Sequence, residues 1–276
     1  NWLVTKLGSS VAYNTLHEWP VRNIARATAD NTVAEGGDAT EPVGDSPTRS
    51  NNATAIYRRI VKVSGTQEAV RVALPGSVME DEKKIKLMRL KADMEYGLLN
   101  GSFASGASGT ARGMAGIVKS ISTNLTARLS GTSFFLTELE DIHQSSWDAV
   151  GGEGFVADVL LVPMGIKRKI ATFTTRVIQN ADSTDHIYND VDLISTSAGM
   201  LKVVPHKDVP NATGSTHVIA IKQDLFRMAF LKGREPKFVE LSKTGDAERG
   251  MYITELTLES LAERASVVRL GYALTG

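Results

Sequence analysis

The sequence contains no cysteine, few aromatic residues and no excess of charge of either sign. The absence of cysteine excludes disulfide scaffolds, Cys-ligated zinc, iron–sulfur clusters and thiol nucleophiles. Lys and Arg total 31, and Asp and Glu also total 31, so the formal net charge is +0. A dedicated nucleic-acid binder needs a basic excess to neutralise phosphates, so this balance argues against that class.

Long apolar runs are also missing. The longest, at about residues 159–166, is far shorter than the ~20 residues that a membrane helix needs. The first twenty residues contain no apolar stretch typical of a signal peptide. Hydrophobic residues nevertheless make up 42% of the 276 residues, so the chain can bury a substantial core. We expect one large domain or two modest ones, and no membrane partner.

Motifs of catalytic and metal sites are absent as well. The five histidines lie far apart, and none belongs to a metal-binding pair such as H-x-x-x-H. Neither a G-x-S-x-G elbow nor a phosphate-binding P-loop occurs. His143, in a predicted helix, is interpreted as a surface or hydrogen-bonded histidine rather than a base. Four aspartates lack the order of a calcium loop: Asp182, Asp185, Asp190 and Asp192. We expect no enzyme activity, no metal and no cofactor.

The first fifty residues differ from a compact domain in composition. Residues 29–54 are rich in Gly, Pro, Asp, Asn and Thr, and Val33 and Val43 are their only large apolar residues. Structureless loops longer than ~15 residues are uncommon inside compact domains. This segment is therefore either a disordered tail, which its composition favours, or an arm ordered against a neighbour.

Residues 55–74 predict a projecting β-hairpin, because two β-rich runs flank a Ser-Gly-Thr turn at 64–66. Its cations are Arg58, Arg59, Lys62 and Arg71. An isolated two-stranded hairpin is only marginally stable in water, so this one needs a partner surface.

The clearest single element is a long helix after Pro75. Ser77 and Glu80 fit an S-x-x-E capping box, and Asn100-Gly101 ends the helix roughly 22 residues later. Two apolar stripes run along it, so we expect it to be covered on two sides. One stripe consists of Ile85, Met88 and Ala92, and the other of Leu87, Leu90, Met94 and Leu98.

Residues 96–137 contain no Asp or Glu, and their cations are Arg112, Lys119 and Arg128. One interpretation is a set of tight turns around a short buried segment at 114–121. The other is a weakly positive surface facing a polyanion such as DNA. The sequence leaves both open.

The rest of the chain predicts an α+β fold with an antiparallel bias. Thr137 and Glu140 fit a second capping box, whose helix ends at 151–152; a buried strand at 159–162 and a helix from Pro163 to 173 follow. The later predicted strands are 187–195, 200–204, 218–221, 227–231, 238–241, 251–258 and 265–273.

The order of arm, hairpin, long capped helix and α+β core resembles the Hong Kong 97-like major capsid fold of tailed bacteriophages. Specific stretches are similar to one family of phage major head proteins, in an order and spacing that run from about residue 15 to the end. They are AEGGDA (34–39), VSGT (63–66), TARGMAGIVKSISTN (110–124), GMLKVVPHKDVP (199–210) and KTGDAERGMYITELTLE (243–259).

The resemblance implies a structural major capsid protein that self-assembles as hexamers and pentamers into an icosahedral head around double-stranded phage DNA. The implied regions are an N-terminal arm (1–54), an E-loop hairpin (55–77), a P-domain with a spine helix (78–151), an A-domain (152–243) and a return to the P-domain (244–276). The implied inter-subunit contacts in the E-loop and arm are Ile56, Arg58, Arg59, Lys62, Val63, Arg71, Glu35 and Asp38.

The same resemblance implies partners and a location. The partners are other copies of the chain, portal and decoration or cement proteins, and packaged DNA bound without sequence specificity. The location is the virion, after assembly in the host cytoplasm. Two alternatives stay open: an encapsulin-like shell of a cellular nanocompartment, and a β-rich secreted enzyme or adhesin whose arm is merely a linker.

Overall fold

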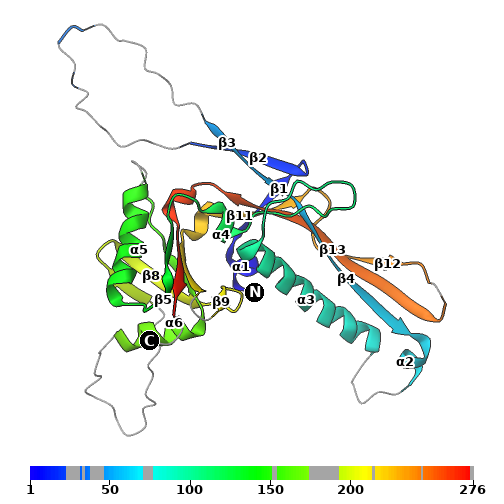
Figure 1. The fold of residues 1–276 in the computed structure, drawn as a ribbon. Helices are drawn as coiled ribbons and strands as arrows, with labels where there is room; N and C mark the ends of the chain where they lie inside the picture. The colour runs from blue at the N-terminus through cyan, green and yellow to red at the C-terminus, as the bar shows by residue number, and fades with distance from the viewer. Residues whose placement is uncertain are drawn as a thin grey trace, which may run out of the picture. The chain divides into compact units, whose positions relative to one another are not determined.

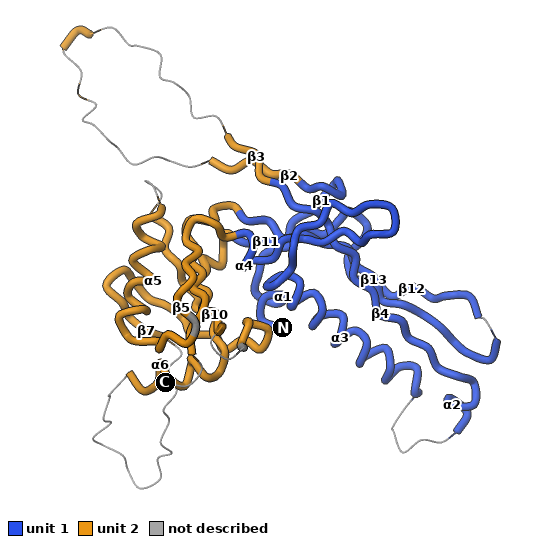
Figure 2. The backbone as a smooth tube through the Cα atoms, viewed as in Figure 1, with its two compact units in different colours: residues 1–17, 51–120, 226–260 blue, residues 18–50, 121–225, 261–276 orange. Residues whose placement is uncertain are grey.

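The computed structural model describes residues 1–22, 32, 35–37, 47–70, 77–150, 154–173, 193–212, 215–243 and 245–273. The chain forms two compact units, each built from separated stretches of sequence (Figure 2). Unit 1 consists of residues 1–17, 51–120 and 226–260, and unit 2 of residues 18–50, 121–225 and 261–276. No helix within the described ranges is long and apolar enough to cross a membrane.

A five-stranded sheet forms the frame of unit 1. Its strands are β1 (Gly8–Ala12), β4 (Ala55–Ser64), β11 (Phe226–Leu231), β12 (Lys237–Leu241) and β13 (Ala247–Ser260). The order is β1-β11-β13-β12, and β4 pairs with the other side of β13. β4 and β13 are antiparallel over ten residue pairs, and Figure 1 shows them extended alongside the long helix α3 (Val78–Asn100). β12 pairs with the other side of β13, so the strands β4, β13 and β12 and the helix α3 form a two-layered part of unit 1 that we call the extension (Figure 1).

Helix α3 confirms the predicted long helix, but only one of its apolar stripes is covered. Leu90, Met94 and Leu98 are buried, as expected for the second stripe. In the first stripe, Met88 remains 60% exposed and Ala92 is also exposed. Contacts within this chain therefore cover only one of the two predicted sides of α3.

The predicted tight turn at 64–66 is a helix instead. Ser64 is the N-cap of α2 (Gly65–Ala69), and its hydroxyl accepts a hydrogen bond from the Gln67 amide. Serine at this position satisfies a free backbone N–H and so favours a helix start over a hairpin turn. Residues 71–76, which include the predicted second strand, lie outside the described residues, and the observed partner of β4 is β13.

Both predicted capping boxes are wrong, although both helices exist. At α3 the Ser77 hydroxyl donates to Glu68 Oε1 (2.5 Å), and the Met79 amide donates to Glu68 Oε2 (3.2 Å). The Glu68 carboxylate of α2 therefore accepts from a first-turn amide of α3, which is the role expected of the Ser77 hydroxyl. Helix α5 (Leu136–Ala149) begins one residue before Thr137, without a side-chain cap.

The N-terminal residues are more ordered than their composition suggests. α1 (Trp2–Lys6) buries Leu3 completely, and β1 pairs in parallel with β11. A second pair of strands, β2 (Leu16–Val21) and β3 (Thr48–Ala53), forms a two-stranded sheet. Most of the predicted tail between them lies outside the described residues. The short helix α4 (Ile117–Ser120) contains the expected buried segment, since Ile117 is fully buried.

Unit 2 is built on a seven-stranded sheet of order β5-β14-β10-β6-β8-β7, with β9 paired to β10. The strands are β5 (Leu125–Thr132), β6 (Val159–Val162), β7 (Leu193–Thr196), β8 (Gly199–Pro205), β9 (Asn211–Ala212), β10 (Ser215–Ile221) and β14 (Val267–Tyr272). Its helices are α5, α6 (Met164–Phe173) and the short 3₁₀ turns η1 (Gln223–Leu225) and η2 (Glu263–Ala265). The buried strand β6 and the helix after Pro163 confirm their predictions.

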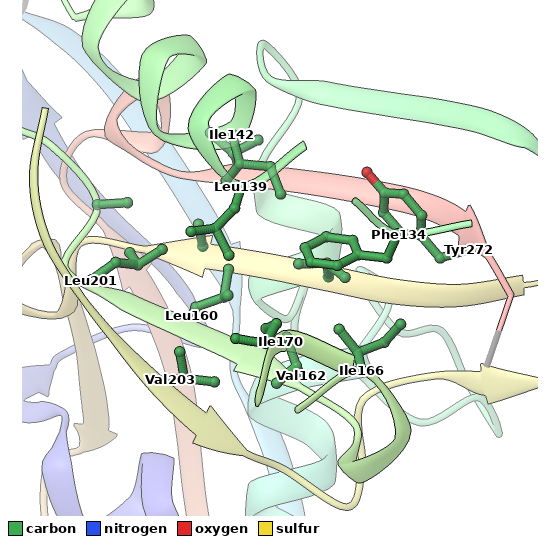
Figure 3. Close-up of a cluster of buried hydrophobic side chains, with 14 residues drawn as sticks. Phe134, Leu139, Ile142, Leu160, Val162, Ile166, Ile170, Leu201, Val203 and Tyr272 are labelled. Carbon is green, nitrogen blue, oxygen red and sulfur yellow. The ribbon is translucent and has the colours of Figure 1, made fainter. Parts of the chain in front are cut away.

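The core of unit 2 lies between its sheet and its two helices. Figure 3 shows Leu139 of α5, Leu160 of β6 and Ile166 of α6 converging on this cluster. The rings of Phe134 and Tyr272 meet edge to face, with centroids 5.1 Å apart. Both sheets mix parallel and antiparallel pairs, mostly antiparallel, so the α+β prediction is confirmed.

Candidate functional site

The sheet of the extension presents an outer face that alternates apolar and cationic rows. In β4 every second residue is exposed, and Ile56 and Ile60 expose 48% and 51% of their surface. The cross-strand rows are Arg58–Ile253–Lys237, Ile60–Met251–Val239 and Lys62–Arg249–Leu241. Directly opposed residues share a face of the sheet, so an apolar band lies between cations. We call these nine residues and Ile56 the outer face.

The inner face of the same sheet packs on α3. Arg59 and Asp93 form two hydrogen-bonded contacts, Nε–Oδ2 and Nη2–Oδ1, each 2.6 Å long. The Lys83 ammonium lies 4.6 Å from the ring centroid of Phe238 on β12. Burial, reinforced by the nearby negative charge of Asp93, raises the pKa of Tyr57 to about 12. These contacts hold the inner face against the helix and leave the outer face available.

A buried carboxylate ties together the base of the extension. Glu255 of β13 has a side chain only 2% exposed. Its Oε1 accepts from Arg112 Nη2 (2.5 Å) and from the Thr54 hydroxyl (2.7 Å), and its Oε2 accepts from Arg234 Nε (3.3 Å). A buried carboxylate is tolerated only when paired and hydrogen-bonded, so these partners are structural.

A second buried carboxylate, Glu95 of α3, fixes the N-terminal segment. Its two oxygens accept hydrogen bonds from the amides of Leu3 and Val4, each 2.8 Å long. Those amides belong to the first turn of α1, where backbone N–H groups have no helical partner. The N-terminal residues are thereby attached to α3.

The predicted inter-subunit residues divide between the two faces of the sheet. Ile56, Arg58 and Lys62 lie on the outer face, whereas Arg59 and Val63 lie on the inner face, with Val63 2% exposed. Glu35 is exposed in the short described stretch 35–37. Asp38 and Arg71 lie outside the described residues. Contact of this set with another subunit stays a prediction.

The three cations considered for a DNA-facing surface are divided between the two units. Arg112 and exposed Lys119 belong to unit 1, whereas Arg128 belongs to unit 2. Arg112 is paired with Glu255, and Arg128 Nη2 lies 2.6 Å from Glu138 Oε2. Their contact with DNA stays a prediction.

Sequence reasoning missed Ile60 of β4 and all outer-face residues of the two later strands, namely Lys237, Val239, Leu241, Arg249, Met251 and Ile253. Alternation within the two later strands was the only signal available for them. It does not reveal that these strands lie beside β4, because that pairing joins distant parts of the chain.

The histidine singled out in the sequence has a structural environment. His143 is 1% exposed, and its Nδ1 is hydrogen-bonded to the Thr196 hydroxyl. Burial lowers its pKa. Of the two interpretations that the sequence left open, a surface or a hydrogen-bonded histidine, the structure shows the second. Among the described residues no group of three or more His, Cys, Asp or Glu side chains could hold a metal ion. Asp182, Asp185, Asp190 and Asp192 lie outside those residues.

Solved structures share this fold at low sequence identity. An encapsulin in the holo-SrpI complex from Synechococcus elongatus PCC 7942 matches with a TM-score of 0.64 and 12% identity, over 100% of this chain and 88% of that one. The capsid of a native GTA particle matches with a TM-score of 0.62 and 10% identity, over 98% of this chain and 90% of that one. A structure from Mycobacterium phage Cain matches with a TM-score of 0.59 and 11% identity, over 98% of this chain and 89% of that one.

Sequence comparison assigns the family. A search of curated proteins finds no match. A sequence model described as SU10 major capsid protein matches residues 1–272, which is nearly the whole chain. Together with a fold shared with Hong Kong 97-like capsid structures, this shows a structural role in a phage capsid and a place in the virion. The chain belongs to the SU10 major capsid protein family.

Proposed function

We propose that the chain assembles as hexamers and pentamers into an icosahedral head around double-stranded phage DNA, and that the outer face is a principal contact between copies. The observation that carries this proposal is the apolar band through Ile60, Met251 and Val239 on the outer face of the sheet. The role is structural, without catalysis.

The composition of the outer face supports a protein partner. Ile56 and Ile60 are each about half exposed, although branched apolar side chains favour burial. Contiguous exposed apolar surface rimmed by polar groups marks interaction sites. Among the described residues, the only carboxylate paired across strands with an outer-face residue is Glu255, which lies opposite Ile56 and is buried. The cations of the outer face therefore favour a partner that carries acidic side chains.

The five-part division from the resemblance is part of this proposal. By order along the chain, β4 and α2 correspond to the E-loop, α3 to the spine helix and unit 2 mainly to the A-domain. We also propose that the partners are portal and decoration proteins and DNA bound without sequence specificity. Assembly takes place in the host cytoplasm. The zero net charge is compatible with a lining that does not hold the genome tightly.

The test is Ile60→Asp, which places a carboxylate in the middle of the apolar band. We expect wild-type chains to form shells visible by negative stain, and the variant to remain folded but unassembled. The matched control is Ala127→Asp, which adds the same charge at an exposed position of β5. Normal shells from Ile60→Asp, or equal loss in both variants, would contradict the assignment of the outer face.

An encapsulin-like shell is the second candidate, since a holo-encapsulin structure covers the whole chain. Membership of a capsid family favours the viral role and leaves the secreted enzyme or adhesin without support. The content of purified native particles separates the two shells. Double-stranded DNA inside the particles supports the capsid, and a protein cargo without DNA supports the nanocompartment.

A further inference from the structure

The side of α3 turned away from the sheet carries cations beside an apolar stripe. Its exposed members include Lys84, Met88, Lys91 and Tyr96, and Met88 and Tyr96 expose 60% and 58% of their surface. Positions 88, 92 and 96 recur every four residues, so they form one stripe along the helix. Lys84 and Lys91 lie together at one edge of that stripe. We call this surface the α3 outer stripe.

Helix α5 in unit 2 presents the complementary pattern. Leu136 and Trp147 are each 49% exposed and lie along one edge of its outward side. Asp141 and Asp148, both exposed, lie along the other edge. A hollow of about 390 Å³ lies beside this surface, lined by Gln144, Trp147, Ser197 and Ala198. We call this surface the α5 outer stripe.

The charges of the two stripes have the same spacing. Lys84 and Lys91 are seven residues apart, and so are Asp141 and Asp148. Seven residues correspond to about 10.5 Å along a helix axis. None of these four side chains forms a salt bridge within the described part of the chain, although the charge of Asp141 acts on Arg269. In two parallel helices, opposite flanks meet across the seam, as in parallel coiled coils. A parallel arrangement therefore brings both lysines to both aspartates in one register.

We propose that the α3 outer stripe is a docking surface for the α5 outer stripe of a second copy, with Lys84 opposite Asp141 and Lys91 opposite Asp148. This inference rests on the proposed self-assembly. In this register Met88 lies two residues, or about 3 Å along the axis, from the level of Trp147, so these two exposed apolar side chains meet across the seam. A polyanion would meet the lysines but would leave the exposed apolar side chains between them in water.

Charge reversal tests the pairing without removing apolar contacts. Lys91→Glu and Asp148→Lys each place like charges together at every copy of the contact, so we expect each to lower the yield of shells by ~tenfold or more. Combining both reversals in one chain restores the attraction, so we expect near-wild-type yield. The matched control is Lys202→Glu, at an exposed position of β8, which should assemble normally.

Cross-linking tests the same contact when a reversed variant fails to fold. The chain has no cysteine, so introduced cysteines are the only reactive thiols. Lys91→Cys chains mixed with Asp148→Cys chains and treated with a short bis-maleimide should give a linked dimer. Lys91→Cys mixed with Lys202→Cys should give little. Equal linkage in both mixtures would overturn the proposal.

The remaining outcomes separate this inference from its alternatives. Failure of the combined reversal to restore shells, with normal folding by circular dichroism, would overturn the pairing. If Lys91→Glu assembled normally and only weakened binding to a random-sequence DNA duplex, the stripe would be a polyanion surface and the proposal would be wrong. If the wild type forms no shells, the proposed function fails, whereas the cross-link between free subunits still tests the pairing.

Discussion

Arg59 of β4 and Asp93 of α3 join strand to helix through two parallel contacts of 2.6 Å. A guanidinium and a carboxylate that meet at two points fix orientation as well as distance. The hydrogen bond and the charge of Asp93 both raise the pKa of Arg59. This pair holds the inner face of the sheet on α3 and so determines that Ile56, Arg58, Ile60 and Lys62 lie on the opposite face.

Arg59→Ala should loosen β4 from α3 without unfolding the chain. Both side chains are roughly one-third exposed or more, so solvent screening keeps the expected loss of unfolding free energy small. Urea unfolding of unassembled subunits measures this loss. Arg58→Ala, on the outer face of the same strand, should change stability by less than ~0.5 kcal/mol. A larger loss from Arg58→Ala would contradict the assignment of faces.

Arg112→Ala should lower the free energy of unfolding more than a substitution in a glycine-rich loop usually does. It removes the shortest charged contact of Glu255, whose side chain is 2% exposed, and leaves that carboxylate with one cation. A hydrogen bond to a charged group contributes about 1.5–3 kcal/mol, and Arg234 and the Thr54 hydroxyl remain on Glu255 in the variant. The unfolding free energy should fall by this amount, whereas exposed Lys119→Ala should have little effect. Equal effects would show that Arg112 does not act through Glu255.

Leu90→Pro should remove the soluble shell altogether. Leu90 is completely buried in the middle of α3, and proline there removes a backbone hydrogen bond and clashes with the preceding turn, at ~3 kcal/mol or more. Negative-stain imaging of expressed material measures the outcome. Leu90→Met keeps the volume and should cost less than ~1.5 kcal/mol, with shells retained. Normal particles from Leu90→Pro would show that α3 is misassigned.

Tyr57 should titrate abnormally late. Its pKa is raised from 10.0 to about 12, first by burial and then by Asp93, so the fold favours the neutral phenol. The stabilisation is complete below the unfolded pKa near 10 and is lost as the pH rises through 12. Absorbance titration of phenolate in wild type and Tyr57→Phe identifies this group. A Tyr57 signal at an ordinary pKa would contradict its burial against α3.

Prediction from sequence succeeded where the signal was local and failed where a distant residue intervened. The period of Leu90, Met94 and Leu98 predicted the buried side of α3, and the apolar run of β6 predicted a buried strand. At α3 the predicted cap failed because Glu68, supplied by a neighbouring helix, accepts the hydrogen bonds of the Ser77 hydroxyl and the Met79 amide. Among the predicted contact residues, alternation along β4 correctly places Ile56, Arg58 and Lys62 on one face of the sheet and Arg59 and Val63 on the other. Alternation does not show which of the two faces α3 covers.

By itself, the sequence determined the α+β composition, the long helix from 78 to 100, the absence of thiol chemistry and, through family resemblance, the capsid role. These features depend on residue types and on periods of two or three to four residues, which neighbouring positions set. The tertiary structure alone decided that β4 pairs with β13, that Arg112 neutralises Glu255, and that the exposed residues of α3 and β4 belong to opposite sides of one extension. Each of these depends on residues far apart in the chain, whose proximity results from closing long loops around a shared core.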